Sequence, residues 1–274
     1  MKNSNQGEMT FLEHLEELRW HIIRSVIAII VFAVLAFIFK KIIFDVVLIA
    51  PKTPDFITNR ILCHLSQVLH MESLCINVKP FQLVSTSMAG QFSTHIWISI
   101  IAGIIVASPV VFYEFWSFVA PALYTKERSH ARGAVFIISF LFILGVLFGY
   151  YLIVPLSVHF LGSYSVSDQV ENMINLWSYF SVIASVSLAS GIVFELPVIV
   201  YFLSKIGLLT PAFMRKYRKH SVIIILTLAA IITPPDVFSQ MLVSVPLYLL
   251  YEVSILISAR VTKKRDAEQR QTSE

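Results

Sequence analysis

The sequence predicts an all-α, polytopic membrane protein with six transmembrane helices and both termini in the cytoplasm. Hydrophobic residues make up 57% of the 274 residues and charged residues 14%. In a soluble domain, about half of the residues are hydrophobic and about a quarter are charged. The mean hydropathy of +0.76 is an average over the whole chain. A value this high over 274 residues indicates several spans in one membrane domain, because a single anchor would not suffice. The basic residues lie between apolar runs and form no basic face, so we expect no nucleic-acid partner.

Residues 1–21 are predicted to form a cytoplasmic N-terminal amphipathic segment. Its apolar residues have helical spacing, with acids on the other side: Phe11, Leu12, Leu15, Leu18 and Ile22. A solvated helix face capped by Thr10 and Glu13 explains this pattern. A basic partner explains it better, because an acidic face is unfavourable beside an anionic membrane surface. The segment has no signal-peptide core, so we expect nothing to be cleaved off.

Residues 22–257 are predicted to form the transmembrane domain. Four apolar runs are long enough to cross roughly 30 Å of hydrocarbon: 22–39, 96–115, 134–154 and 179–203. In the third run, Gly145 and Gly149 form a small-xxx-small pattern that is typical of close helix packing.

A proline turn divides the last apolar region into two helices, 221–232 and 237–257. Pro234 and Pro235 remove two backbone donors, and Asp236, which follows them, is a candidate cap for the next helix. The fifth span has about 12 residues, or about 18 Å. We therefore expect helices 5 and 6 to be short and to form a shallow hairpin.

The positive-inside rule favours cytoplasmic termini. With the N-terminus inside, 16 of the 21 basic residues fall on the cytoplasmic side, including those of a basic tail at 258–274. The other five lie in a long external loop, 40–91: Lys40, Lys41, Lys52, Arg60 and Lys79. Cys63 and Cys75 share this loop, where an oxidising environment permits a disulfide.

Enzyme chemistry finds little support in the sequence. The eight histidines are scattered over both sides without metal-ligand spacing. Neither a glycine-rich phosphate loop nor a recognised nucleophile motif occurs. We therefore expect no enzyme activity, no metal and no cofactor.

Two acids are candidates for function. Glu127 follows Pro121 on the same side of the membrane as Glu17, although Lys126 and Arg128 also suit it to a surface ion pair. Glu195 lies inside the fourth span, where a carboxyl group is costly and needs a cavity, a partner or a proton. A structural hydrogen bond is the alternative for Glu195. Pro197 predicts a kink at the same level.

Four motifs, taken together, resemble the TatC family of the twin-arginine protein translocase. They are FLEHLEELR at 11–19, SP at 108–109 with FVAPALY at 118–124 and ER at 127–128, FELP at 194–197 and TPPDVFSQ at 233–240. They occur in the family's order over about 11–257, which covers nearly the whole membrane domain. The long external loop is the least recognisable part.

The resemblance implies a concave bundle of six helices in a bacterial cytoplasmic membrane. It implies that the chain reads twin-arginine signal peptides and exports folded proteins with the proton gradient. Signal-peptide binding is then expected at Glu17, Arg19, Phe118 and Glu127. The family's intramembrane acid matches Glu195.

The resemblance also implies partners: lipid, further copies in a larger complex, and single-span TatA or TatB subunits. A partner helix would dock at Thr233 and Gln240. Glu114 stands where glutamine is more usual, and Ala230 replaces a larger methionine, so local affinities are expected to differ. A proton-coupled secondary transporter that uses Glu195 is the alternative function. No internal repeat supports that alternative.

Overall fold

The computed structural model describes residues 11–70, 75–77, 81–119, 131–167, 169, 172–233 and 237–272, and most of them are helical. The chain divides into two compact units. The first combines residues 1–38 and 99–139, and the second combines residues 39–98 and 140–274.

The first unit pairs one long helix with most of a second, whose residues 90–98 belong to the second unit. α1 (Phe11–Ile38) runs without interruption from the amphipathic segment through the first span. α3 (Gly90–Val119) packs against α1 at Gly103, where the absence of a side chain lets the backbone of α1 come close. A Cβ atom on Gly103 would lie 2.7 Å from the backbone nitrogen of Ala33, so a larger residue would force the two helices apart.

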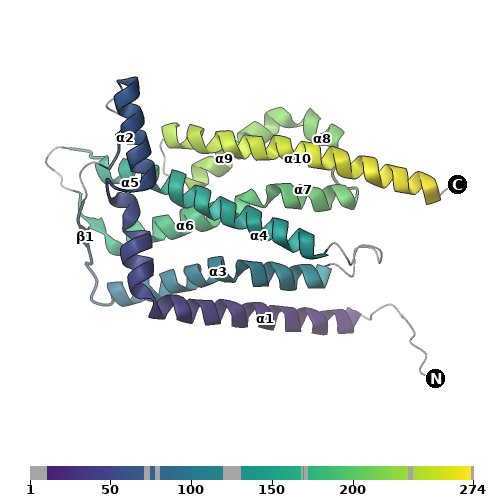
Figure 1. The fold of residues 1–274 in the computed structure, drawn as a ribbon, viewed down its shortest axis with the longest axis horizontal. Coiled ribbons are helices and arrows are strands. Elements are labelled where there is room, and N and C mark those ends of the chain that lie inside the picture. Colours follow the sequence, from purple (N-terminus) through teal and green to yellow (C-terminus); the bar gives the residue numbers. More distant parts are fainter. Residues whose placement is uncertain are drawn as a thin grey trace. The chain divides into compact units, whose positions relative to one another are not determined.

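The second unit holds the remaining elements, several of them in the predicted external loop (Figure 1). In that loop lie a π-helical turn Ile42–Leu48, a 3-10 turn Ala50–Lys52, α2 (Ile57–Leu69) and β1 (Leu83–Val84). β1 pairs in parallel with β2 (Ile174–Asn175). α4 (Ala131–Phe148) starts in the first unit, and a π-helical turn Gly149–Ile153 joins it to α5 (Val154–Ser163).

Two buried asparagines hold the segment between α1 and α3 together. Asn59 donates to the carbonyls of Pro51 at 3.0 Å and Thr53 at 2.7 Å. Asn77 donates to the carbonyl of Pro155 at 3.1 Å and takes a left-handed conformation with φ 54°. These amides satisfy carbonyls that no regular ladder reaches, so the loop is fixed onto the start of α5.

Glycines allow close helix packing in the second unit, as the small-xxx-small pattern predicts. A Cβ on Gly145 would lie 2.6 Å from the carbonyl oxygen of Ser190, and one on Gly149 2.7 Å from the Ser190 hydroxyl. Gly191 faces back in the same way, with Val146 2.8 Å from the position of its Cβ. This packing is confirmed between α4 and α6 (Leu176–Phe194).

The fourth span breaks at Glu195, so the predicted kink is confirmed. α6 ends at Phe194, and α7 (Leu196–Lys205) begins directly afterwards with Pro197 as its second residue. Proline has no amide hydrogen to donate into the preceding turn, so the helix changes direction there.

The C-terminal part of the second unit is a hairpin of two helices, α9 (Arg218–Ile232) and α10 (Val237–Thr272), preceded by the short helix α8 (Pro211–Lys216) (Figure 1). α10 contacts both α7 and α9. The Ser204 hydroxyl donates to that of Ser258 at 2.7 Å, and the Tyr251 hydroxyl donates to the Met214 carbonyl at 2.8 Å.

Within the described residues, five helical stretches are long and apolar enough to cross a membrane, which confirms the polytopic helical class. They are Leu15–Ile38, Gly90–Phe118, Gly133–Ser163, Leu176–Lys205 and Gln240–Ala267. The remaining predicted span is α9, whose 15 residues reach about 22 Å. Its shortness is as expected.

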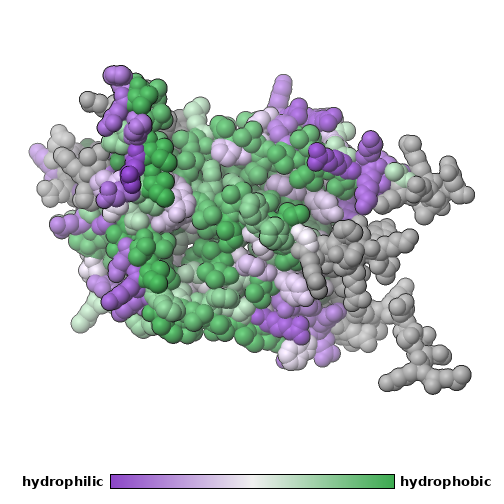
Figure 2. All heavy atoms as spheres, viewed as in Figure 1, coloured by the Kyte–Doolittle hydropathy of each residue, from purple (hydrophilic) through white to green (hydrophobic). Residues whose placement is uncertain are grey.

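The expectation that the sixth helix is short is wrong. α10 has 36 residues because the segment 258–274, predicted to be a separate basic tail, continues the helix to Thr272. Arg265 supports the extension by donating to the carbonyl of Ser204, near the end of α7, at 3.3 Å. Figure 2 shows hydrophobic residues over the middle of this unit's helices and hydrophilic ones around α8 and the end of α10.

The orientation can be tested by cysteine labelling in a chain whose Cys63 and Cys75 are replaced by serine. We expect Lys219→Cys to react only after the membrane is permeabilised, because the basic residues at 215–219 mark the cytoplasmic side. Met88→Cys, fully exposed in the external loop, is the matched control and should react in intact cells. Labelling of Lys219→Cys by an impermeant reagent from outside would reverse the orientation.

The Cys63–Cys75 bond, present in the structure with a sequence separation of 12, makes a second prediction. Thiol alkylation of the native protein should leave both cysteines unmodified and label both after reduction. A loop of this size is stabilised by about 2–4 kcal/mol, so Cys63→Ser should lower thermal stability measurably. Two alkylated cysteines without reduction would show that the native protein is unpaired.

Candidate functional site

The first unit brings the predicted signal-peptide residues of α1 close to a buried ionic pair. Glu17 is half-buried and Arg19 is exposed. One turn after Glu17, the Nδ1 atom of His21 lies 2.5 Å from Oε2 of Glu114 on α3. The two side chains are 13% and 11% exposed. The hydrogen bond thus joins α1 to α3 through two residues that are 93 positions apart in the sequence.

Phe118 lies against this pair. Its ring meets the His21 ring edge-on, with 6.1 Å between centroids. Arg24, 61% exposed, approaches the same Glu114 oxygen at 3.7 Å. The unit therefore brings the Phe118 ring and the Arg24 guanidinium to the His21–Glu114 pair, one helical turn from Glu17 on α1. Glu127, the other predicted acceptor, lies outside the described residues.

Glu195 lies between α6 and α7 and is half-buried. Among the described residues, neither of its carboxylate oxygens has a hydrogen-bond partner, although both oxygens are buried. The backbone of Phe142 interacts with this carboxyl group. A partner, a proton and a structural contact with the Phe142 backbone all remain as explanations of this acid.

The two predicted partner-helix residues have intramolecular contacts. Thr233 is buried and donates to the Ala229 carbonyl at 2.8 Å. Gln240 is half-buried and donates through Nε2 to the Leu226 carbonyl at 3.0 Å, which links α10 to α9. The turn residues Pro234, Pro235 and Asp236 lie outside the described residues.

A cavity of about 330 Å³ opens beside Thr233. Its lining comes from α5, α6 and α9: Leu161, Ser181, Val182, Ser185, Val186, Ile231, Ile232 and Thr233. Ser185 precedes Glu195 by ten residues, or about 15 Å along a helix. The structure therefore places Glu195 and Thr233 at different levels of the unit and does not join them into one site.

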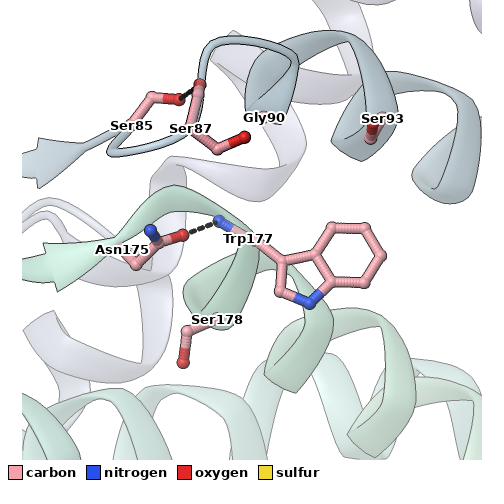
Figure 3. Close-up of a pocket in the computed structure, with 7 residues that line it drawn as sticks. All are labelled: Ser85, Ser87, Gly90, Ser93, Asn175, Trp177 and Ser178. Carbon is pink, nitrogen blue, oxygen red and sulfur yellow. Dashed lines mark hydrogen bonds between the residues drawn. The ribbon is translucent and has the colours of Figure 1, made fainter.

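A second cavity, of about 440 Å³, opens between the start of α3 and the start of α6 (Figure 3). Four serines, Gly90, Asn175 and Trp177 line it. Asn175 accepts from the Trp177 amide at 2.8 Å, and Ser85 donates to the Ser87 carbonyl at 3.3 Å. These polar groups cap a helix and close a turn, which explains why they are there without a ligand.

Sequence reasoning missed two ionic contacts. Glu114 was noted only as a residue that stands where glutamine is more usual, and His21 only as one of the scattered histidines. The second contact joins Arg218 of α9 to Glu252 of α10 at 2.6 Å, and Tyr248 donates to the same carboxylate at 3.0 Å. An acid within an apolar helix was the available clue for both glutamates.

Comparison with known proteins finds one family. The family described as Sec-independent protein translocase protein (TatC) matches residues 13–246. The TatC of Blattabacterium sp. subsp. Periplaneta americana is 42% identical over 97% of this chain and all of its own length. The TatCy protein of Bacillus subtilis is 32% identical over 96% of this chain and 94% of its own.

Solved structures agree with the sequence relatives. A crystal structure of the twin-arginine translocase receptor TatC in DDM aligns with a TM-score of 0.69 and 33% identity, covering 90% of this chain and 99% of that one. Another crystal structure of the receptor aligns with a TM-score of 0.66 and 32% identity, over 91% and 100% of the two chains. The chain belongs to the TatC family of Sec-independent protein translocase proteins.

Proposed function

We propose that this chain is the signal-peptide receptor and core subunit of a twin-arginine translocase in the bacterial cytoplasmic membrane. The observation that carries the proposal is the match of the family over nearly the whole chain, at up to 42% identity among the relatives described above. The transporter alternative finds no support among these relatives, which are named as translocase proteins.

The receptor role is assigned to Glu17 and Glu127, with Arg19 and Phe118 beside them. A guanidinium group binds best to fixed carboxylates that accept charge-assisted, bidentate hydrogen bonds. Glu17 is half-buried on α1, and the Phe118 ring contacts His21 one turn further along the same helix. Partial dehydration strengthens such a contact over an open surface pair.

The export role needs partners, and we assign them to single-span TatA and TatB subunits that dock at Thr233 and Gln240. The 330 Å³ cavity beside Thr233 supports this docking place, because two of its walls, α5 and α6, carry apolar and serine side chains that suit helix packing. The chain itself then acts as a platform without catalysing a covalent reaction, and the proton gradient supplies the energy.

The receptor assignment predicts that Glu17→Ala and Glu127→Ala each weaken twin-arginine peptide binding. Losing one charged contact costs about 1.5–3 kcal/mol, on the order of ten- to a hundredfold in affinity. Binding to inserted protein, measured for twin-arginine and twin-lysine peptides, tests this. Glu16→Ala is the matched control, because Glu16 is an exposed acid on the same helix. If both variants bound like the parent, the site would lie elsewhere.

The intramembrane acid gives a further prediction. Glu195→Gln should insert normally but reduce export of a folded twin-arginine reporter severalfold or more, because the amide keeps size and polarity but loses the charge and the titratable proton. Glu195→Asp retains a carboxyl group and should export better than Glu195→Gln. Normal export by Glu195→Gln would limit this residue to a structural role.

A further inference from the structure

The His21–Glu114 pair lies where it controls the geometry of the proposed receptor site. Glu17 and His21 are four residues apart and share one face of α1. Glu114 and Phe118 are likewise four residues apart on α3, and the rings of His21 and Phe118 touch edge-on. The pair therefore stands one helical turn from a proposed peptide-binding residue on each helix.

The contact is buried and specific. Its 2.5 Å separation joins two side chains that are 13% and 11% exposed. The separation of 2.5 Å is that of a hydrogen bond between Nδ1 of His21 and Oε2 of Glu114. A buried carboxylate deprived of this hydrogen bond is left unsatisfied, and the local packing must change to hydrate it.

The carboxylate has little exposed surface for a ligand. The oxygen that faces His21 also faces Arg24 at 3.7 Å, and the whole side chain is only 11% exposed. Glutamine, the residue expected here from the family resemblance, offers a carbonyl oxygen that accepts the same hydrogen bond without any charge. Hydrogen bonding is therefore the property that both residue types share.

We propose that His21 and Glu114 are positioning residues, whose hydrogen bond fixes α1 against α3 so that Glu17 and Phe118 meet the signal peptide in the correct register. This inference rests on the proposed receptor function. It assigns the pair an indirect role: neither side chain binds the arginines of the peptide, and the negative charge of Glu114 is not needed.

Four single variants and one double variant of the full chain, inserted in membranes, test the pair. Glu114→Leu and His21→Leu remove the hydrogen bond, while Glu114→Gln and His21→Asn keep an acceptor and a donor in the same places. Affinity for twin-arginine and twin-lysine peptides is measured for each, with thermal unfolding as the check on folding. Arg24→Ala is the matched control, because it removes the neighbouring charge but leaves the pair intact.

We expect each leucine variant to reduce twin-arginine selectivity by roughly tenfold. The double leucine variant should lose no more than either single one, because both break the same contact. Glu114→Gln, His21→Asn and Arg24→Ala should stay within about threefold of the parent. Should a leucine variant fail to insert, Glu114→Ala or His21→Ala takes its place, because alanine also removes the hydrogen bond and should reduce selectivity to the same extent.

Two results would overturn the inference. Loss of selectivity in Glu114→Gln as large as that in Glu114→Leu would make Glu114 a charged ligand of the peptide. Unchanged selectivity in both leucine variants, in a parent that discriminates the two peptides, would remove the pair from the site and leave the receptor function standing. A parent that shows no discrimination at all would overturn the receptor function and the positioning role together.

Discussion

Backbone amides and carbonyls in hydrocarbon have no water to bind, so the chain must satisfy them within its own helices. This constraint leaves side chains to decide how the helices approach one another. Gly103, Gly145, Gly149 and Gly191 carry no side chain, and backbone or side-chain atoms of the neighbouring helix lie 2.6–2.8 Å from the position that a Cβ would take. The positions of the polar groups depend on these contacts, because Glu195 directly follows Phe194, against which Gly145 packs.

Two membrane-domain acids illustrate different solutions to the cost of a buried carboxyl group. Glu114 has a histidine at 2.5 Å and an arginine at 3.7 Å, and it is thereby suited to holding helices together. Glu195 lies at a helix break with neither oxygen bonded among the described residues. A group left in this state in a folded domain is available to a proton or a partner, which agrees with its place in the export hypothesis.

The sequence predicted the helical class, the spans and the break at Glu195, because hydropathy, length and proline act locally along the chain. The cysteine pair was a candidate on the same local grounds. The structure of the long loop at 40–91 was not predicted in detail. Asn59 and Asn77 shape it through hydrogen bonds to carbonyls up to 78 residues away, which local sequence patterns do not reveal. The His21–Glu114 contact likewise joins distant segments, and neither residue type signals it alone. The length of α10 was missed because the charged residues after 257 mark the end of a membrane span, but charged residues can still continue a helix.

The extended α10 also has a mechanical consequence. Gln240 near its start is bonded to α9, and Arg265 near its end is bonded to α7. These two anchor points are separated by 25 residues, or about 38 Å of continuous helix. One helix thus ties α9 to α7 along its length, and Pro246, between the two anchors, is its weakest point because proline removes a backbone hydrogen bond. The contact with α7 and the contact with α9 are therefore joined by backbone alone, without any relay of side chains.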